Sequence, residues 1–420
     1  MIIQEYQILA DQGDAESQNY LGDSFFYGRN DLIKDHKQAV YWYALAAQQD
    51  HTIAQFKLAN CYASGQGVPK DLELAATWFI KAAQNGYANA QYNIATYYDW
   101  GIGVTQDESC AVSWYEKAAN QGHIESQYNL AECYHTGRGV TENLFVAFDW
   151  YKKSADAGYV VSQYTVGTYY ENGDIELNLD KALSWYEKAA NQGYTLAKYK
   201  VANIYMSKNC NIDKAMVLYL EAAQDGYANS QFKMGEFFED GIFVDQDLEQ
   251  AFGWYLLAAE QAHVEAQLKL GEFYYNGDGV DQDLYLSFEW YKKAAEQGDS
   301  TAQYELVDYY CEGKIIGPDL EQAFVWCERA AKQGNIEAQY NLGLCYMDGK
   351  GIPKNLSQAA YWFEIAANNG DHRAELNIGL CYVTGSGVEK DVNQAFKWFK
   401  KAADEGDIRA LLNIGVYDLD

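Results

Sequence analysis

Small, aliphatic and aromatic residues recur along the chain at the spacing i, i+4, i+5 and i+8, which places them on one face of an α-helix. In the stretch 338–370 this pattern runs through Ala338, Leu342, Gly343 and Tyr346. Nearly the same stretch returns about every 36 residues. Such a period is typical of a solenoid, in which each repeat buries its apolar face against its neighbours. We therefore predict an all-α solenoid of about eleven helix-turn-helix repeats.

Each repeat is predicted to contain two helices, here called helix A and helix B. Helix A opens at a small residue and ends at a glycine such as Gly65 or Gly349, where a left-handed backbone conformation can close a helix. Its opening positions are Ala15, Ala54, Ala90, Ser126, Ser162, Ala197, Ser230, Ala266, Ala302, Ala338, Ala374 and Ala410. A glycine or alanine five residues after the opening position would let a neighbouring helix approach closely.

Helix B follows an aspartate or asparagine, whose side chain can accept hydrogen bonds from the free N–H groups of the first turn. These residues are Asp35, Asp71, Asp107, Asn143, Asn178, Asn211, Asp247, Asp283, Asp319, Asn355 and Asp391. Helix B also carries a recurring tryptophan, which we predict to form the core. The tryptophans of this column are Trp42, Trp78, Trp114, Trp150, Trp185, Trp254, Trp290, Trp326, Trp362 and Trp398.

The repeat pattern predicts one solenoid over residues 1–420 with half repeats at both ends, 1–13 and 408–420. The first arc covers 14–170, where the first repeat has three extra residues around Arg29 to Lys34, and the second arc covers 228–407. Over 171–227 the fifth repeat is shortened, and the sixth lacks its glycines and has Leu218 at the tryptophan position. We predict that this irregular segment changes the curvature of the solenoid and separates a first arc from a second, acidic arc.

The formal net charge is -29, and the acidic excess lies mainly in the second half of the chain. Residues 211–350 alone contain 26 acidic and 9 basic side chains. This charge argues against nucleic acid and against insertion into an anionic membrane. No run approaches the 18 apolar residues of a membrane span, and the first residues lack the features of a signal peptide. We expect a cytoplasmic monomer, or a periplasmic or secreted protein if a signal was removed.

The pattern A-x-x-x-L-G-x-x-Y, G-x-G-V and D-x-x-x-A-x-x-W-Y-x-K-A-A-x-x-G is clearest at residues 90–122 and 266–298. It resembles the Sel1-like repeat, a relative of the tetratricopeptide repeat, over essentially the whole chain. The resemblance implies a right-handed α/α superhelical solenoid whose A helices line a concave surface. It also implies a non-enzymatic adaptor or scaffold of bacterial type. The motif residues are structural, so the resemblance transfers no catalytic residue.

Several short motifs resemble parts of known binding or catalytic signatures. The repeated G-x-G lacks the strand and third glycine of a dinucleotide site. His123-Ile124-Glu125 lacks the P-C-x-x-C of a zinc deaminase. Ser230-Gln231-Phe232-Lys233 matches S-x-x-K of a β-lactamase or penicillin-binding protein, but Ser230 is at a packing position and no K-T-G occurs. We therefore expect no metal, no cofactor and no catalytic residue, and an enzyme of that type is the least favoured alternative.

The variable positions of helix A, at offsets 3, 6 and 10 from its opening residue, share one face and are predicted to point into the concavity. Acidic residues gather there in repeats seven to ten, with Lys233 and Lys269 as partly neutralising cations. Trp100 is the only tryptophan outside the core column and is a candidate anchor. The predicted partner-binding residues are Glu236, Asp240, Glu272, Asp308, Glu312, Asp348 and Trp100.

The sequence is compatible with three functions. The first is an adaptor that binds a protein or peptide with a basic surface. The second is an immunity protein that neutralises a secreted bacterial toxin by direct binding, which rescue of cells from such a toxin would reveal. The third is the enzyme considered above. A solvated charged face without a ligand is the alternative to the acidic binding site.

Overall fold

The computed structural model describes residues 2–30, 32–313, 315 and 317–417, and over these residues the secondary structure consists of 24 α-helices. The helices are α1 (Ile2–Asp11), α2 (Ala15–Tyr27), α3 (His36–Gln48), α4 (Thr52–Ser64), α5 (Leu72–Gln84), α6 (Ala88–Trp100), α7 (Glu108–Asn120), α8 (Ile124–Thr136), α9 (Leu144–Asp156), α10 (Val160–Asn172), α11 (Leu179–Asn191), α12 (Thr195–Ser207), α13 (Ile212–Gln224), α14 (Ala228–Asp240), α15 (Leu248–Glu260), α16 (Val264–Asn276), α17 (Leu284–Glu296), α18 (Ser300–Glu312), α19 (Leu320–Lys332), α20 (Ile336–Asp348), α21 (Leu356–Asn368), α22 (His372–Thr384), α23 (Val392–Asp404) and α24 (Ile408–Tyr417).

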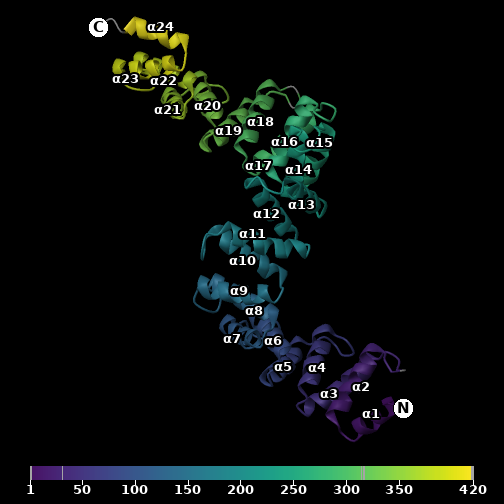
Figure 1. The fold of residues 1–420 in the computed structure, drawn as a ribbon. Helices are drawn as coiled ribbons and strands as arrows, with labels where there is room; N and C mark the ends of the chain where they lie inside the picture. The colour runs from purple at the N-terminus through teal and green to yellow at the C-terminus, as the bar shows by residue number, and fades with distance from the viewer. Residues whose placement is uncertain (1, 31, 314, 316, 418–420) are drawn as a thin grey trace. The chain divides into compact units, whose positions relative to one another are not determined.

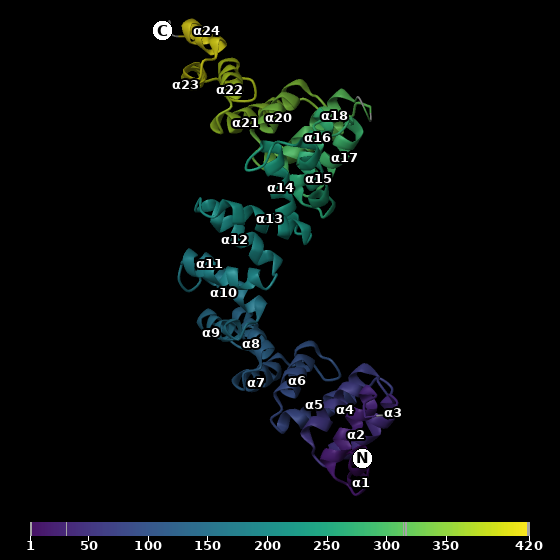
Figure 2. The same cartoon turned by 45° about the vertical axis from the view of Figure 1, so that its right-hand side comes forward.

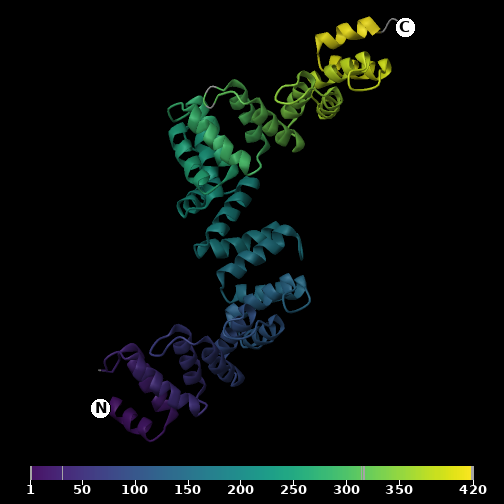
Figure 3. The same cartoon turned by 180° about the vertical axis from the view of Figure 1, so that it is seen from behind.

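The predicted A helices are the even-numbered helices from α2 to α22, and the predicted B helices are the odd-numbered helices from α3 to α23. Within each unit and leaving α13 aside, an A helix packs on the B helix of its own repeat, and neighbouring repeats meet where a B helix packs on the next A helix. Figures 1 and 3 show this succession from opposite sides. The shorter α1 and α24 occupy the half repeats at the two ends. The all-α solenoid fold is therefore confirmed.

The chain forms two compact units, Met1–Leu218 and Tyr219–Asp420, and each is considered by itself. Helices α14, α16, α18 and α20 belong to the second unit and carry six of the predicted binding residues (Figure 2). Helix α6, which ends at Trp100, belongs to the first unit.

The predicted helix ends are present in the structure. The N–H of Gln250 donates to Asp247 Oδ1 at 3.0 Å in the first turn of α15. Side-chain caps of this kind occur at ten of the eleven predicted residues, and each contributes about 1 kcal/mol. The eleventh, Asn211, has a left-handed backbone with φ 51°. Helix A ends at left-handed glycines such as Gly349, with φ 77°.

Helix A and helix B approach most closely at the small residue of helix A. A Cβ atom added to Gly343 would lie 2.6 Å from the ring of Phe363 on α21. Equally close pairs are Gly22 with Tyr43, Gly167 with Tyr186, Gly235 with Tyr255, Gly271 with Tyr291, and Gly379 with Phe399. The predicted role of the small residue, close approach of a second helix, is confirmed at these six positions.

The prediction that the tryptophan column forms the core needs correction. Five of its ten rings are buried, but others, such as Trp114 and Trp150, are only half-buried. The residue after each tryptophan lies deeper: Tyr115, Tyr151 and Phe363 are almost fully buried. At seven of the ten tryptophans, a basic residue three positions later lies over the ring, as when Lys153 Nζ lies 3.6 Å from the ring centre of Trp150.

A column of glutamines, which our sequence analysis did not consider, joins the repeats through buried hydrogen bonds. Gln303 Nε2 donates to the carbonyl of Ala295 at 3.1 Å, and Gln333 Nε2 donates to Gln303 Oε1 at 2.8 Å. The same pair of bonds occurs at Gln18, Gln55, Gln91, Gln163, Gln231, Gln267 and Gln339. Each satisfied amide links one repeat to the next without leaving a buried polar group unpaired.

In the first repeat, the predicted alignment of Ala15 with Ala54 is wrong. Ala15 is the first residue of α2 and is only partly buried, whereas the equivalent Ala54 is the third residue of α4 and is fully buried. Ser17 takes that third position in α2 and is buried. The alignment failed because two small residues, Ala15 and Ser17, lie within one turn of the helix.

Candidate functional site

The structure places the predicted acidic residues on helices α14, α16, α18 and α20 of the second unit. Asp240, Asp308, Glu312 and Asp348 are exposed, and Glu236 and Glu272 are half-buried. Trp100 lies at the end of α6 in the first unit with 68% of its surface exposed. Its predicted exposure is therefore confirmed, but its role as an anchor stays a prediction.

Lysines of helix A neutralise part of this acidic face, as the sequence predicted. Lys233 Nζ lies 2.6 Å from a carboxylate oxygen of Glu236. Lys269 Nζ lies 3.3 Å from Glu272 on its own helix and 2.9 Å from Glu239 on α14. The acidic charge of α14 and α16 is thus partly compensated within the chain.

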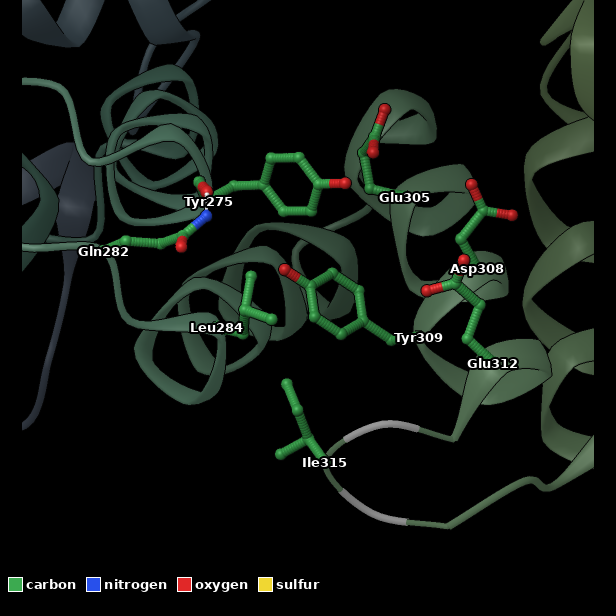
Figure 4. Close-up of a pocket in the computed structure, with 8 residues that line it drawn as sticks. All are labelled: Tyr275, Gln282, Leu284, Glu305, Asp308, Tyr309, Glu312 and Ile315. Atoms are coloured by element: carbon green, nitrogen blue, oxygen red, sulfur yellow. Dashed lines mark hydrogen bonds between the residues drawn. The ribbon is translucent and has the colours of Figure 1, made fainter.

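A cavity of about 270 Å³ opens between α16, α17 and α18. It is lined by Tyr275, Gln282, Leu284, Glu305, Asp308, Tyr309, Glu312 and Ile315. Figure 4 shows the rings of Tyr275 and Tyr309 projecting into the space between α16 and α18, with the three carboxylates arranged along α18. The structure thus brings together Asp308 and Glu312, which were predicted, with Glu305 and two tyrosines, which were not.

The aromatic walls of this cavity are fixed by contacts. The rings of Tyr275 and Tyr309 meet edge to face, with centroids 6.5 Å apart and an interplanar angle of 78°. The Tyr309 hydroxyl donates to Ser287 Oγ at 2.7 Å. The Ser287 hydroxyl in turn donates to the Gly271 carbonyl at 2.6 Å. Gln282 Nε2 donates to the Tyr275 carbonyl at 2.6 Å. The ring of Tyr309 is therefore held by a hydrogen bond, whereas Tyr275 is anchored through its main chain and contacts the Tyr309 ring.

The ionised forms of Glu305 and Asp308 on α18 are disfavoured by desolvation and by neighbouring negative charges. Burial, followed by the charges of Asp308 and Glu272, raises the pKa of Glu305. Asp308 is exposed overall, but partial desolvation of its carboxylate, followed by the charge of Glu312, raises the pKa of Asp308. Among the described residues, no lysine or arginine forms an ion pair with Glu305 or Asp308. An added cation would remove this repulsion, so the site is suited to a positively charged group.

Sequence reasoning missed Glu305 although a signal for it exists. Glu305 occupies offset 3 of helix A, where eight of the other ten repeats carry lysine or asparagine, including Lys269 before it and Asn341 after it. The sign of the charge at this offset therefore reverses in the ninth repeat. Tyr309 had no such signal, because its column is otherwise a core position. Its exposure to the cavity follows from packing against Ser287.

The raised pKa of Glu305 predicts how stability depends on pH. Because folding raises this pKa above its ordinary value of 4.5, ionised Glu305 destabilises the folded chain once the pH exceeds its folded pKa. We expect Glu305→Gln to be more stable than the wild type at pH 7. The difference should shrink as the pH falls toward 4.5. Urea unfolding of both proteins, followed by circular dichroism across this pH range, measures it.

A control of opposite sign is Asp247→Asn. The N–H and side chain of Gln250 lower the pKa of Asp247 below its ordinary value of 3.8, so between the lowered pKa and 3.8 this variant should lose stability relative to the wild type as the pH rises. The unfolding series is therefore extended below pH 3.8. If Glu305→Gln and Asp247→Asn change in the same direction with pH, the assignment of a strained carboxylate to Glu305 is wrong.

Comparison with known families accounts for the repeat architecture. The family model for the Sel1 repeat matches eleven consecutive segments, residues 15–51, 52–87, 88–123, 124–159, 160–194, 197–227, 228–263, 264–299, 300–335, 336–371 and 372–407. The chain belongs to the Sel1 repeat family. Sel1 repeat proteins are scaffolds that generally take part in protein–protein interactions.

Comparison with solved structures finds similar chains. The crystal structure of c5321, a protective antigen present in uropathogenic Escherichia coli strains, is 34% identical, with a TM-score of 0.84 over 99% of this chain and 90% of that chain. A Sel1 repeat protein from Oxalobacter formigenes is 31% identical, with a TM-score of 0.46 over 50% of this chain and 85% of that one. Immunity protein Pa5087 from Pseudomonas aeruginosa is 22% identical, with a TM-score of 0.32 over 50% of this chain and 81% of that one.

None of the curated proteins compared with this Sel1 repeat chain matches it. In the part of the chain that the structure describes, no helix has the length and apolar character needed to cross a membrane. Within the same residues, no group of three or more His, Cys, Asp or Glu side chains is arranged to hold a metal ion.

Proposed function

We propose that this Sel1 repeat protein is a monomeric scaffold that binds a basic segment of a protein or peptide along the acidic A-helix face of repeats seven to ten. The observation that carries the proposal is the cavity on α18, where Glu305 and Asp308 form no ion pair with a described lysine or arginine. A net charge of -29 would also attract a basic partner at long range. In this proposal the chain acts by binding and catalyses no reaction.

Charge reversal tests the proposal. We expect the combined substitution of Glu236, Glu272, Asp308 and Glu312 by lysine to weaken binding of an unstructured peptide of alternating arginine and serine by roughly 100-fold at low salt, because attraction becomes repulsion. Fluorescence anisotropy of the labelled peptide measures the affinity. Added salt should weaken binding to the wild type, since exposed charges are screened.

A matched control carries four substitutions elsewhere. Glu249, Glu260, Glu296 and Glu321 are exposed residues of B helices in the same unit. Replacing all four by lysine changes the net charge by +8, from -29 to -21, as the test variant does. The control should retain most of the peptide affinity. Equal losses in both variants would mean that net charge alone attracts the peptide, and the proposed face would then be wrong.

The same two variants identify cellular partners. A partner of the acidic face should be captured by the wild type and by the control but lost with the test variant. Circular dichroism of each variant confirms that lost capture does not come from unfolding.

A further inference from the structure

We propose that the cavity between α16 and α18 holds the side chain of a single arginine of the partner. This inference rests on the proposed function and specifies the chemistry at its centre. The site, here called the arginine pocket, consists of Tyr275, Glu305, Asp308 and Tyr309 with the apolar side chain of Leu284 at its base.

The size of the arginine pocket suits one side chain. Its volume of about 270 Å³ falls just below the range typical of pockets for drug-sized molecules, which begins at roughly 300 Å³. Leu284 supplies an apolar surface for an aliphatic stem, and the carboxylates of α18 supply acceptors for a charged end. A long side chain with an apolar stem and a cationic end matches both the apolar surface and the carboxylates.

The carboxylates of the arginine pocket are best satisfied by a positively charged hydrogen-bond donor. Ionised Glu305 and Asp308 can only accept hydrogen bonds, and their positions three residues apart put them on the same face of α18. A guanidinium group has five N–H donors in a planar fork and can bond two carboxylates at once. An ammonium group is more strongly hydrated and lacks this planar match, so arginine is favoured over lysine.

The exposed ring of Tyr275 supplies a surface for stacking. Its side chain is 51% exposed although its main chain is anchored by Gln282. A planar guanidinium stacks on such a ring and also gains cation–π attraction. Partial shielding from water by Tyr309 strengthens both interactions.

The same unit already holds one of its own arginines by this chemistry. The guanidinium carbon of Arg373 lies 4.3 Å from the ring centre of Tyr340, and its Nη2 atom donates to Glu337 at 2.7 Å. In the first unit, Lys57 lies 2.7 Å from Asp23 and 5.5 Å from the ring centre of Tyr43. A cation that lies near both a tyrosine ring and a carboxylate thus occurs more than once in this fold.

The arginine pocket has the tyrosines and carboxylates of that combination, but no described lysine or arginine forms an ion pair with Glu305 or Asp308. Elsewhere the cation comes from offset 3 of helix A, as with Lys57, Lys200 and Lys269. In α18 this offset holds Glu305, and in α20 it holds Asn341, whose Nδ2 donates to the Tyr304 hydroxyl at 2.6 Å. A partner arginine would supply the missing positive charge.

The test measures binding of N-acetyl-arginine amide to the full chain by ligand-observed NMR. We expect a dissociation constant of roughly 1 mM, in keeping with the size of the probe. Glu305→Gln and Tyr275→Ala should each weaken binding, the first by about tenfold because a charge-assisted hydrogen bond is lost. The lysine analogue should bind several-fold more weakly, and the uncharged citrulline analogue should bind at least about tenfold more weakly.

Two matched controls lie on helix B. Glu296→Gln removes an exposed acid at the end of α17, and Tyr285→Ala removes a ring that is 56% exposed, close to the 51% of Tyr275. Both should bind the probe within about twofold of the wild type. Equal binding of citrulline and arginine, or equal losses in control and pocket variants, would overturn the arginine pocket.

The pocket and the proposed function can fail separately. If the fourfold charge reversal abolishes binding of the arginine-serine peptide but Glu305→Gln and Tyr275→Ala leave the probe affinity unchanged, the acidic face stands and the arginine pocket is wrong. If the pocket variants weaken the probe but the charge reversal leaves peptide binding intact, the pocket stands and the proposed acidic face is wrong.

Discussion

Replacing Gly343 by leucine is expected to destabilise the protein by about 3 kcal/mol, near the upper end of the usual cost of overpacking. A Cβ atom at this position would already lie 2.6 Å from Cδ1 and Cε1 of Phe363. The ring of Phe363 is fully buried, so it cannot move aside without disturbing α21. Leucine has a high helix propensity, so the loss would come from packing and not from the helix itself. Urea unfolding followed by circular dichroism measures the effect.

Gly253→Ala is the matched control, because this glycine lies inside helix α15 and a Cβ atom there would meet nothing within 4 Å. We expect it to stabilise the protein by about 0.5–1 kcal/mol, since alanine loses less backbone entropy in a helix. A Gly343→Leu variant as stable as the wild type would contradict the close approach of α20 and α21.

Replacing Phe363 by alanine is expected to destabilise the protein by about 3–5 kcal/mol, the usual cost of removing a buried aromatic ring. Phe363 is 0% exposed and belongs to the core formed by α20, α21 and α22, where it packs with Ile378 and Cys381. Its removal would leave a cavity at the contact between helix A and helix B. The same urea unfolding experiment measures the loss.

Two comparisons show whether this loss comes from the ring. Tyr361 lies two residues earlier on α21 with 52% of its surface exposed, so Tyr361→Ala should change stability by less than about 0.5 kcal/mol. Adding Gly343→Ala to Phe363→Ala should cost less than Gly343→Ala in the wild type, because the clashing ring is gone. Additive effects would mean that Gly343 and Phe363 are not in direct contact.

Much of the fold could be predicted because its signals are local and repeated. The cap at Asp247, the left-handed glycine at Gly349 and the apolar stripe through Leu342 each depend on a few neighbouring residues. Repetition in eleven units then made each signal unambiguous. The corrections arose where neighbouring positions compete: Ala15 with Ser17 for one helical position, and Trp362 with Phe363 for the centre of the core.

The candidate site was only partly predictable because it depends on contacts between helices. Asp308 and Glu312 stood out as acids at variable offsets of one helix. Tyr309 did not, since its column packs in the core in most repeats and its place at a cavity depends on contacts with α16 and α17, such as those with Tyr275 and Ser287. Glu305 was visible as a charge reversal at offset 3, but its burial and its proximity to Asp308 and Glu272 are properties of the packed helices.

The sequence by itself determined the period, the helix ends, the family and the acidic character of the second half, because these follow from local backbone preferences and from composition. Tertiary structure alone decided which rings fill the core, which carboxylates pair with a cation among the described residues and where a cavity remains between α16 and α18. The physical reason is that burial and charge pairing depend on distances between helices, and those distances are set by how side chains of different repeats fit together.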